Sequence, residues 1–174
     1  MVNEYIATFK PLRPLALVFK QILFLAKLND PFLGGLSSYG LILFLVSYLQ
    51  FRTNHFPNSS GGESPFSLGY LMFDLLQFFA SYKIYMLEMT PAHPQQPSEK
   101  NPIASHTNGY QLIIKDPLNE SNIVTKPLKK VISLESLIYH LYYSLFHDTK
   151  GSLLEQLFEA ARINGMLEKN MIIV

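Results

Sequence analysis

The chain has 174 residues, of which 48% are hydrophobic, and its formal net charge is +1. This composition excludes wholesale disorder, and the length suits one domain with a sizeable core, which we expect to cover residues 1–174. The near-neutral charge gives no global signal for nucleic acid, and the lack of cysteine excludes disulfides and thiolate metal sites.

Two apolar helices joined by a turn form the first predicted unit. The helices are predicted at Leu15–Leu28 and Leu36–Phe51, with Lys20 and Lys27 on one face of the first. The turn contains a proline and two consecutive glycines, and Ser37 is a natural N-cap for the second helix. A membrane hairpin is the alternative interpretation. Both runs are shorter than the roughly 18–20 apolar residues that a span needs, so we expect no membrane segment.

The rest of the chain predicts further helices and a little β-structure. Helices are expected at Leu68–Tyr82, capped by Ser67, at Leu134–Phe146, capped by Ser133, and from Ser152 to about Asn164. The segments Ile84–Leu87 and Tyr110–Lys115 are β-prone and are expected to pair as a hairpin, and residues 116–127 to form turns. The predicted fold is therefore mainly α, a compact helical bundle with one small β-hairpin.

The start of the second helix has the elements of an anion site. A helix N-terminus offers unpaired N–H groups and positive potential, and Ser37 and Ser38 add hydroxyl groups there. Lys20 on the preceding antiparallel helix could lie nearby, and Tyr39 offers a ring on which a base could stack. The same residues also fit a plain helix cap and a solvated lysine, so the residues alone leave both interpretations open.

The spelling of three blocks resembles a known family. RPLALVFKQILFLAKLND with GGLSSYGLILFLVSYLQ is similar to the central domain of template-independent RNA nucleotidyltransferases, the atypical poly(A) and poly(U) polymerases of the DNA polymerase β-like superfamily. SLGYLMFDLLQFFASY resembles the start of their poly(A)-polymerase-associated region, which would span 63–127. DPLNESNIV is similar to the family's nucleotide recognition motif, typically D-P-x-x-x-x-N-D-V-G-R.

The resemblance implies roles for individual residues. Lys20 and Ser38 correspond to the family's triphosphate-contacting lysine and serine, and Tyr39 to the tyrosine that stacks on the incoming base. Asn122 matches the asparagine of the recognition motif. Neighbouring candidates for nucleotide binding are Ser37, Lys27 and Lys126.

The chain departs from the family pattern at several positions. Some members carry a second lysine four residues after the first, where this chain has Phe24, and Lys27 is shifted by almost one turn. After Asn122 the chain reads Ile-Val-Thr-Lys instead of Asp-Val-Gly-Arg. Lys126 therefore stands where arginine would be, and it lacks the planar guanidinium group that makes bidentate contacts. These changes put the preferred base in doubt.

The catalytic carboxylates of the family have no counterpart in this chain. Nucleotidyl transfer needs carboxylates that hold two metal ions, and the family provides them in a Gly-Ser motif with Asp-x-Asp before the RPL block. No Asp-x-Asp occurs here. The resemblance therefore implies ATP or UTP as substrate, and Mg²⁺ or Mn²⁺ only together with a catalytic domain absent from this chain. We expect the chain alone to be inactive.

The expected partners are that catalytic nucleotidyltransferase domain, an RNA 3′ end and an RNA-binding protein subunit. The alternative is a non-catalytic scaffold or binding module of an RNA-processing complex. We expect an intracellular protein, nuclear or cytoplasmic, with the nucleus favoured.

Two observations allow two interpretations each. A basic strip is formed by Lys115, Lys126, Lys129 and Lys130, and it is either solvated or contacts RNA. Asp74 is either exposed or hydrogen-bonded to a neighbouring domain.

Overall fold

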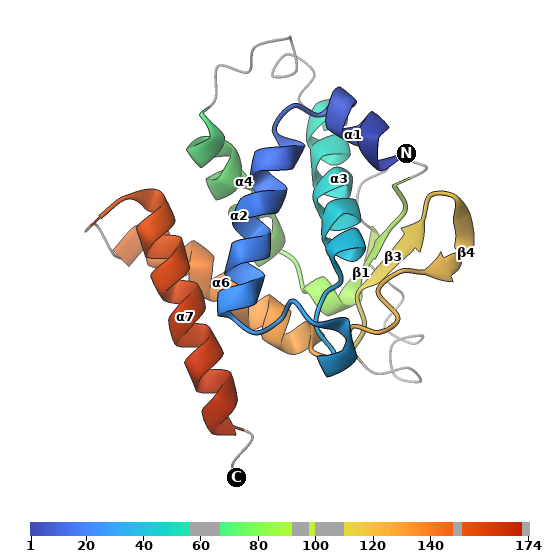
Figure 1. Cartoon of the computed structure of the whole chain (residues 1–174). Coiled ribbons are helices and arrows are strands. Elements are labelled where there is room, and N and C mark those ends of the chain that lie inside the picture. The colour runs from blue at the N-terminus through green and yellow to red at the C-terminus, as the bar shows by residue number, and fades with distance from the viewer. Residues whose placement is uncertain (56–66, 92–97, 100–109, 148–150, 172–174) are drawn as a thin grey trace.

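The computed structural model describes residues 1–55, 67–91, 98–99, 110–147 and 151–171, and is mainly α-helical, as predicted (Figure 1). The helices are α1 (Val2–Thr8), α2 (Leu12–Leu25), α3 (Ser38–His55), α4 (Leu68–Ala80), α6 (Val131–His147) and α7 (Leu153–Met171), with 3-10 turns η1 (Pro31–Leu33) and η3 (Ile84–Met86). The strands are β1 (Leu87–Met89), β2 (Ser98–Glu99), β3 (Ile113–Asp116) and β4 (Asn119–Ile123).

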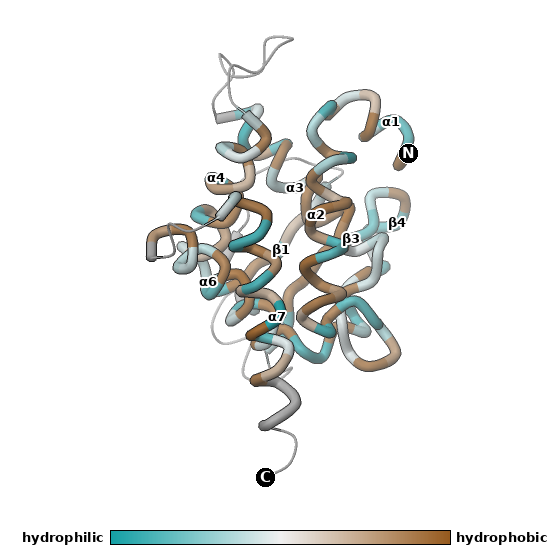
Figure 2. Tube along the Cα trace, turned by 60° about the vertical axis from the view of Figure 1, so that its left-hand side comes forward, coloured by the Kyte–Doolittle hydropathy of each residue, from teal (hydrophilic) through white to brown (hydrophobic). Residues whose placement is uncertain are grey.

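The helices pack around one apolar core. Helix α2 contacts α3 and α7, and α6 contacts α4 and α7. Figure 2 shows apolar residues recurring along α2 and α3, and the rings of Phe44 and Phe79 stack at 3.9 Å between α3 and α4. Gly165 of α7 lies so close to the end of α2 that an added Cβ would stand 2.4 Å from the carbonyl oxygen of Leu25. Burial on several sides explains why α3 is apolar almost all round.

The β-structure differs from the predicted hairpin. The strand order is β2-β1-β3-β4, and β1 pairs with β3 in parallel, Glu88 opposite Ile113. The hairpin prediction was wrong because β2 occupies the antiparallel position beside β1, and the long connection to β3 allows a parallel return. The antiparallel pair instead joins β3 to β4, in a segment predicted as turns.

Three local predictions also change. Helix α2 ends at Leu25, so Lys27 lies beyond it, with a left-handed φ of 58°. Helix α6 begins at Val131, so Ser133 lies inside it and is not its cap. Asp74, which is partly exposed, pairs within this chain: Tyr48 donates a hydrogen bond to it and Arg52 forms an ion pair with it.

The predicted caps of α3 and α4 are confirmed. Ser37 Oγ accepts a hydrogen bond from Gly40 N, and Ser67 Oγ accepts one from Tyr70 N.

Candidate nucleotide-binding site

The turn between α2 and α3 is fixed by its own backbone. Gly35 N donates to the carbonyl of Asp30 at 2.8 Å, and Leu36 N to that of Leu28 at 2.7 Å. The Asp30 side chain accepts from Phe32 N at 2.9 Å and so caps η1. The carbonyl of Gly34, a residue with φ of 81°, accepts from the amides of Lys129 and Lys130. The start of α3 is therefore held in place from two sides.

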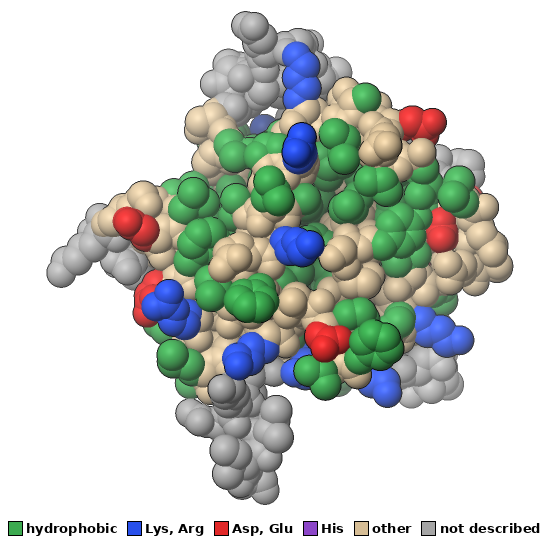
Figure 3. All heavy atoms as spheres, viewed as in Figure 1, with side chains coloured by type: hydrophobic (Ala, Val, Ile, Leu, Met, Phe, Trp, Pro, Cys, Tyr) green, Lys and Arg blue, Asp and Glu red, His purple; other side chains and the backbone are tan. Residues whose placement is uncertain are grey.

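The N-terminus of α3 exposes Ser38. Ser37 is the cap, and its oxygen is engaged by Gly40 N at 3.0 Å. Ser38 opens the helix and is exposed, so its hydroxyl can meet an anion at the positive end of the helix. Lys20 is exposed on α2, on the same helix face as Leu17 and Phe24. Figure 3 shows Lys and Arg side chains along the middle of this face of the molecule, over α2.

Tyr39 and Asn122 are joined by a carboxylate between them. Tyr39 Oη donates to Asp116 Oδ1 at 3.2 Å, and Asn122 Nδ2 donates to Asp116 Oδ2 at 3.1 Å. These three residues come from α3, β3 and β4. The sequence analysis assigned no role in the site to Asp116. The available signal was the Asp-Pro pair that opens the recognition motif, because Asp116 is its first residue. The structure thus brings together the two residues predicted to contact the base.

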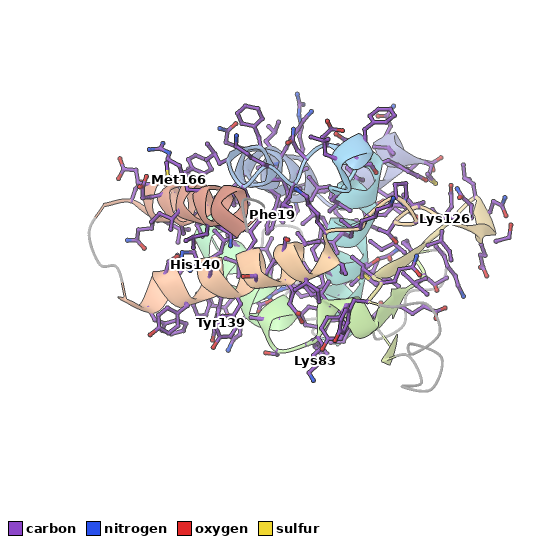
Figure 4. All side chains as sticks on the ribbon, turned by 90° about the horizontal axis from the view of Figure 1, so that it is seen from below. Phe19, Lys83, Lys126, Tyr139, His140 and Met166 are labelled. Carbon is purple, nitrogen blue, oxygen red and sulfur yellow. The ribbon has the colours of Figure 1, made fainter. Side chains whose placement is uncertain are left out.

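A cavity of about 410 Å³ opens beside this pair. It is lined by Tyr39, Asn122, Ile123, Val124, Lys126 and Pro127. Three predicted site residues, Tyr39, Asn122 and Lys126, therefore share one cavity, whereas Lys20, Lys27, Ser37 and Ser38 lie outside its lining. In Figure 4 Lys126 lies at the end of the molecule that carries the strands, far from Tyr139 and Met166.

The loop that carries Lys126 is attached to β3 through a side chain. Thr125 Oγ1 donates to the carbonyl of Leu112 at 2.7 Å and accepts from Ile114 N at 3.0 Å. Val124 N also donates to Ile114 O at 2.9 Å. Thr125 stands where the family motif has glycine, and its hydroxyl takes the place of a backbone group in the ladder. Lys115, the first lysine of the predicted basic strip, instead forms an ion pair with Glu88 at 2.6 Å.

Burial and the neighbouring Asp116 carboxylate raise the pKa of Tyr39 from its ordinary value of 10.0 to about 12. The folded protein therefore holds this phenol proton more tightly than the unfolded chain. The stabilisation is complete below pH 10, and we expect it to be lost as the pH rises towards 12. The difference between the unfolding free energies of the wild type and Tyr39→Phe, measured by urea titration from pH 8 to 12, should shrink over this range. A constant difference would contradict the assignment.

The described residues do not form a metal centre. Within the described ranges, no three His, Cys, Asp or Glu side chains lie together as ligands. Across the same ranges, no helix has both the length and the apolar character needed to cross a membrane.

Comparison with known proteins identifies the class. No family model matches the chain. It is 28% identical over 139 residues to the poly(A) RNA polymerase cid14 of Schizosaccharomyces pombe, covering 78% of this chain and 20% of that protein. It is 30% identical over 130 residues to the poly(A) RNA polymerase gld-4 of Caenorhabditis elegans, covering 70% of this chain and 15% of that protein.

Solved structures agree on the fold. A cytoplasmic RNA terminal U-transferase matches with a TM-score of 0.69 at 20% identity, over 88% of this chain and 56% of that one. A variant of the Cid1 poly(U) polymerase bound to MgATP matches with a TM-score of 0.68 at 21% identity, with the same coverage. The chain therefore has the fold of part of an RNA nucleotidyltransferase. It is a relative of the poly(A) RNA polymerases, as its motifs predicted, and spans 15–28% of the length of the curated relatives it matches.

Proposed function

We propose that this chain is the nucleotide-binding central segment of an enzyme that adds nucleotides to RNA 3′ ends, with ATP or UTP as substrate. One observation carries the proposal: Tyr39, Asn122 and Lys126 line a single cavity although Tyr39 is far from the other two in the sequence. An aromatic ring can stack on a base, and an amide and an ammonium group can hydrogen-bond to its edge.

The triphosphate is assigned to the neighbouring start of α3. The exposed Ser38 and the helix N-terminus that it opens are assigned as the anion site, and Lys20 adds a positive charge from the exposed face of α2. We assign Ser37 to capping this helix and Lys27 to the turn that orients it. The base would then lie on Tyr39, with its edge towards Asn122 and Lys126.

The chemical step is assigned to a catalytic domain outside this chain. In this proposal that domain supplies the carboxylates for Mg²⁺ or Mn²⁺, and the RNA 3′ end enters between the two parts. Exposed apolar side chains support such a partner: Leu17 and Phe24 flank Lys20 on α2 with 63% and 60% of their surface exposed, and Phe32 of η1 is 98% exposed. Apolar groups exposed together mark protein–protein contacts. An RNA-binding subunit is a further proposed partner.

The test is nucleotide binding by the full 174-residue chain. Lys20→Ala removes a charge-assisted contact to the triphosphate, so we expect the affinity for ATP and UTP to fall about tenfold or more by calorimetry. The control is Lys83→Ala, because Lys83 is an exposed lysine that points away from the body of the protein (Figure 4). We expect this control to bind like the wild type. Equal affinities of Lys20→Ala and wild type would refute the triphosphate assignment. A wild type that binds neither nucleotide would favour a non-catalytic scaffold.

A further inference from the structure

Helix α6 has a second apolar face, and that face is exposed. Its core face carries Leu134, Leu137 and Leu141, which are at most 3% exposed. Figure 4 shows Tyr139 on the side of α6 that is turned away from α7. On this outer side lies a set of exposed residues at alternating spacings of four and three, which we call the α6 stripe: Ile132, Ser136, Tyr139, Tyr143 and Phe146. A helix that is apolar on opposite faces is normally buried on both.

The α6 stripe lacks the charges of a solvated helix face. The sequence of α6 has no lysine or arginine, and its one acidic residue, Glu135, accepts a hydrogen bond from Ile84 N at 3.2 Å. By contrast, the exposed surface of α7 carries an ion pair between Glu159 and Arg162. The large side chains of the stripe keep 45% to 60% of their surface exposed. Such an uncharged aromatic surface is typical of a protein–protein contact, and without cations it does not suit nucleic acid.

The order of side-chain sizes along the stripe fits a second copy of the same helix. We propose that two copies of this chain associate through α6 as an antiparallel, twofold-symmetric pair centred on Tyr139. Spacings of four and three are those of the contact positions in paired helices. In this pair Ile132 lies against the larger Phe146 of the other copy, and Ser136 lies against the larger Tyr143. A parallel pair would set small against small and large against large, which leaves a gap in one layer and crowds the next.

The size of the stripe is sufficient for a weak dimer. At the twofold axis the two Tyr139 rings can stack with an offset and keep their hydroxyl groups in water. The exposed side-chain area is roughly 400–500 Å² per copy, so a pair buries on the order of 1,000 Å², the lower limit for a specific interface. We therefore expect a reversible dimer with a dissociation constant of about 10–100 μM. The inference does not rest on the proposed function, because in Figure 4 Tyr139 lies far from Lys126 and the cavity that Lys126 lines.

Sedimentation equilibrium of the full chain at increasing concentration tests the association. Tyr139→Arg places two like charges on the twofold axis, so its dissociation constant should rise about tenfold or more. The control is Leu118→Arg, which adds the same charge to an apolar residue that is 77% exposed in the β3–β4 turn, and it should associate like the wild type. A wild type that stays monomeric well above the expected dissociation constant would overturn the inference. So would a Tyr139→Arg variant that associates like the wild type.

Cross-linking tests the antiparallel geometry. The chain has no cysteine, so each introduced cysteine reports on one position. Tyr139→Cys should form a disulfide between copies under mild oxidation, because the twofold axis brings position 139 next to itself. Ile132→Cys should cross-link to Phe146→Cys when the two variants are mixed, and neither should cross-link alone. Leu118→Cys is the control and should stay monomeric. Cross-linking of Ile132→Cys with itself, and not with Phe146→Cys, would indicate a parallel pair and overturn the proposed arrangement.

Discussion

Replacing Gly35 with alanine is expected to lower the free energy of unfolding by about 3 kcal/mol, the upper end of the cost of inserting one atom group into a packed site. A Cβ here would stand 2.4 Å from the carbonyl oxygen of Leu28 and 2.9 Å from that of Asp30. Both are backbone atoms, and both accept the hydrogen bonds that close the turn. The clash therefore cannot be relieved by rotating a side chain.

The same substitution should also weaken nucleotide binding. To accommodate the methyl group the turn must open, which displaces Ser38 and the first amides of α3 from the triphosphate position. Urea unfolding and calorimetry with ATP measure the two effects on one protein. Asn29→Ala is the matched control, because Asn29 is an exposed residue of the same turn, and it should change neither quantity. Wild-type stability in Gly35→Ala would show that this close approach is not required.

Replacing Thr125 with valine is expected to cost about 2–3 kcal/mol of folding free energy, because it keeps the shape but removes the hydroxyl. Thr125 is 1% exposed, and valine would leave the amide of Ile114 and the carbonyl of Leu112 without this partner in a buried place. The loop that carries Lys126 would lose its attachment to β3, so nucleotide affinity should fall as well.

Thr125→Ser is the control for this position. Serine keeps the hydroxyl and both hydrogen bonds and deletes only a methyl group, so we expect about 1 kcal/mol of destabilisation and near-normal nucleotide binding. Urea unfolding of both variants provides the comparison. Equal losses in the valine and serine variants would show that packing of the methyl group, and not the hydroxyl, holds the loop.

Local signals in the sequence were sufficient for much of this structure. Helical periodicity predicted α2, α3, α4, α6 and α7 but not the short helix α1. The serines before α3 and α4 are caps, as expected from side chains that satisfy free amides. Strand pairing was wrong because it depends on contacts between distant segments, which no local pattern encodes. Lys27 was placed on a helix because the apolar spacing continues through Leu28, which is buried by the turn instead.

The family motif predicted that three candidate residues would lie together, but it did not predict what Asp116 and Thr125 do. Tyr39, Asn122 and Lys126 meet in one cavity, as their assignment to one nucleotide requires. Asp116 was read as turn chemistry, although its carboxylate connects two segments that are 77 positions apart. Thr125 was read as a departure from the motif, and only the structure reveals the two backbone groups that its hydroxyl satisfies.

The carbonyl of Gly34 has a consequence for how the two halves of the proposed site communicate. It accepts from the amides of Lys129 and Lys130, which follow the cavity-lining segment after one intervening residue, Leu128. The turn that presents α3 and the segment that carries Lys126 are thus mechanically linked. Ordering of one half by a ligand lowers the entropic cost of ordering the other. A nucleoside and inorganic triphosphate should therefore bind with positive cooperativity. The binding free energy of an intact nucleotide should then exceed the sum of the binding free energies of its two parts.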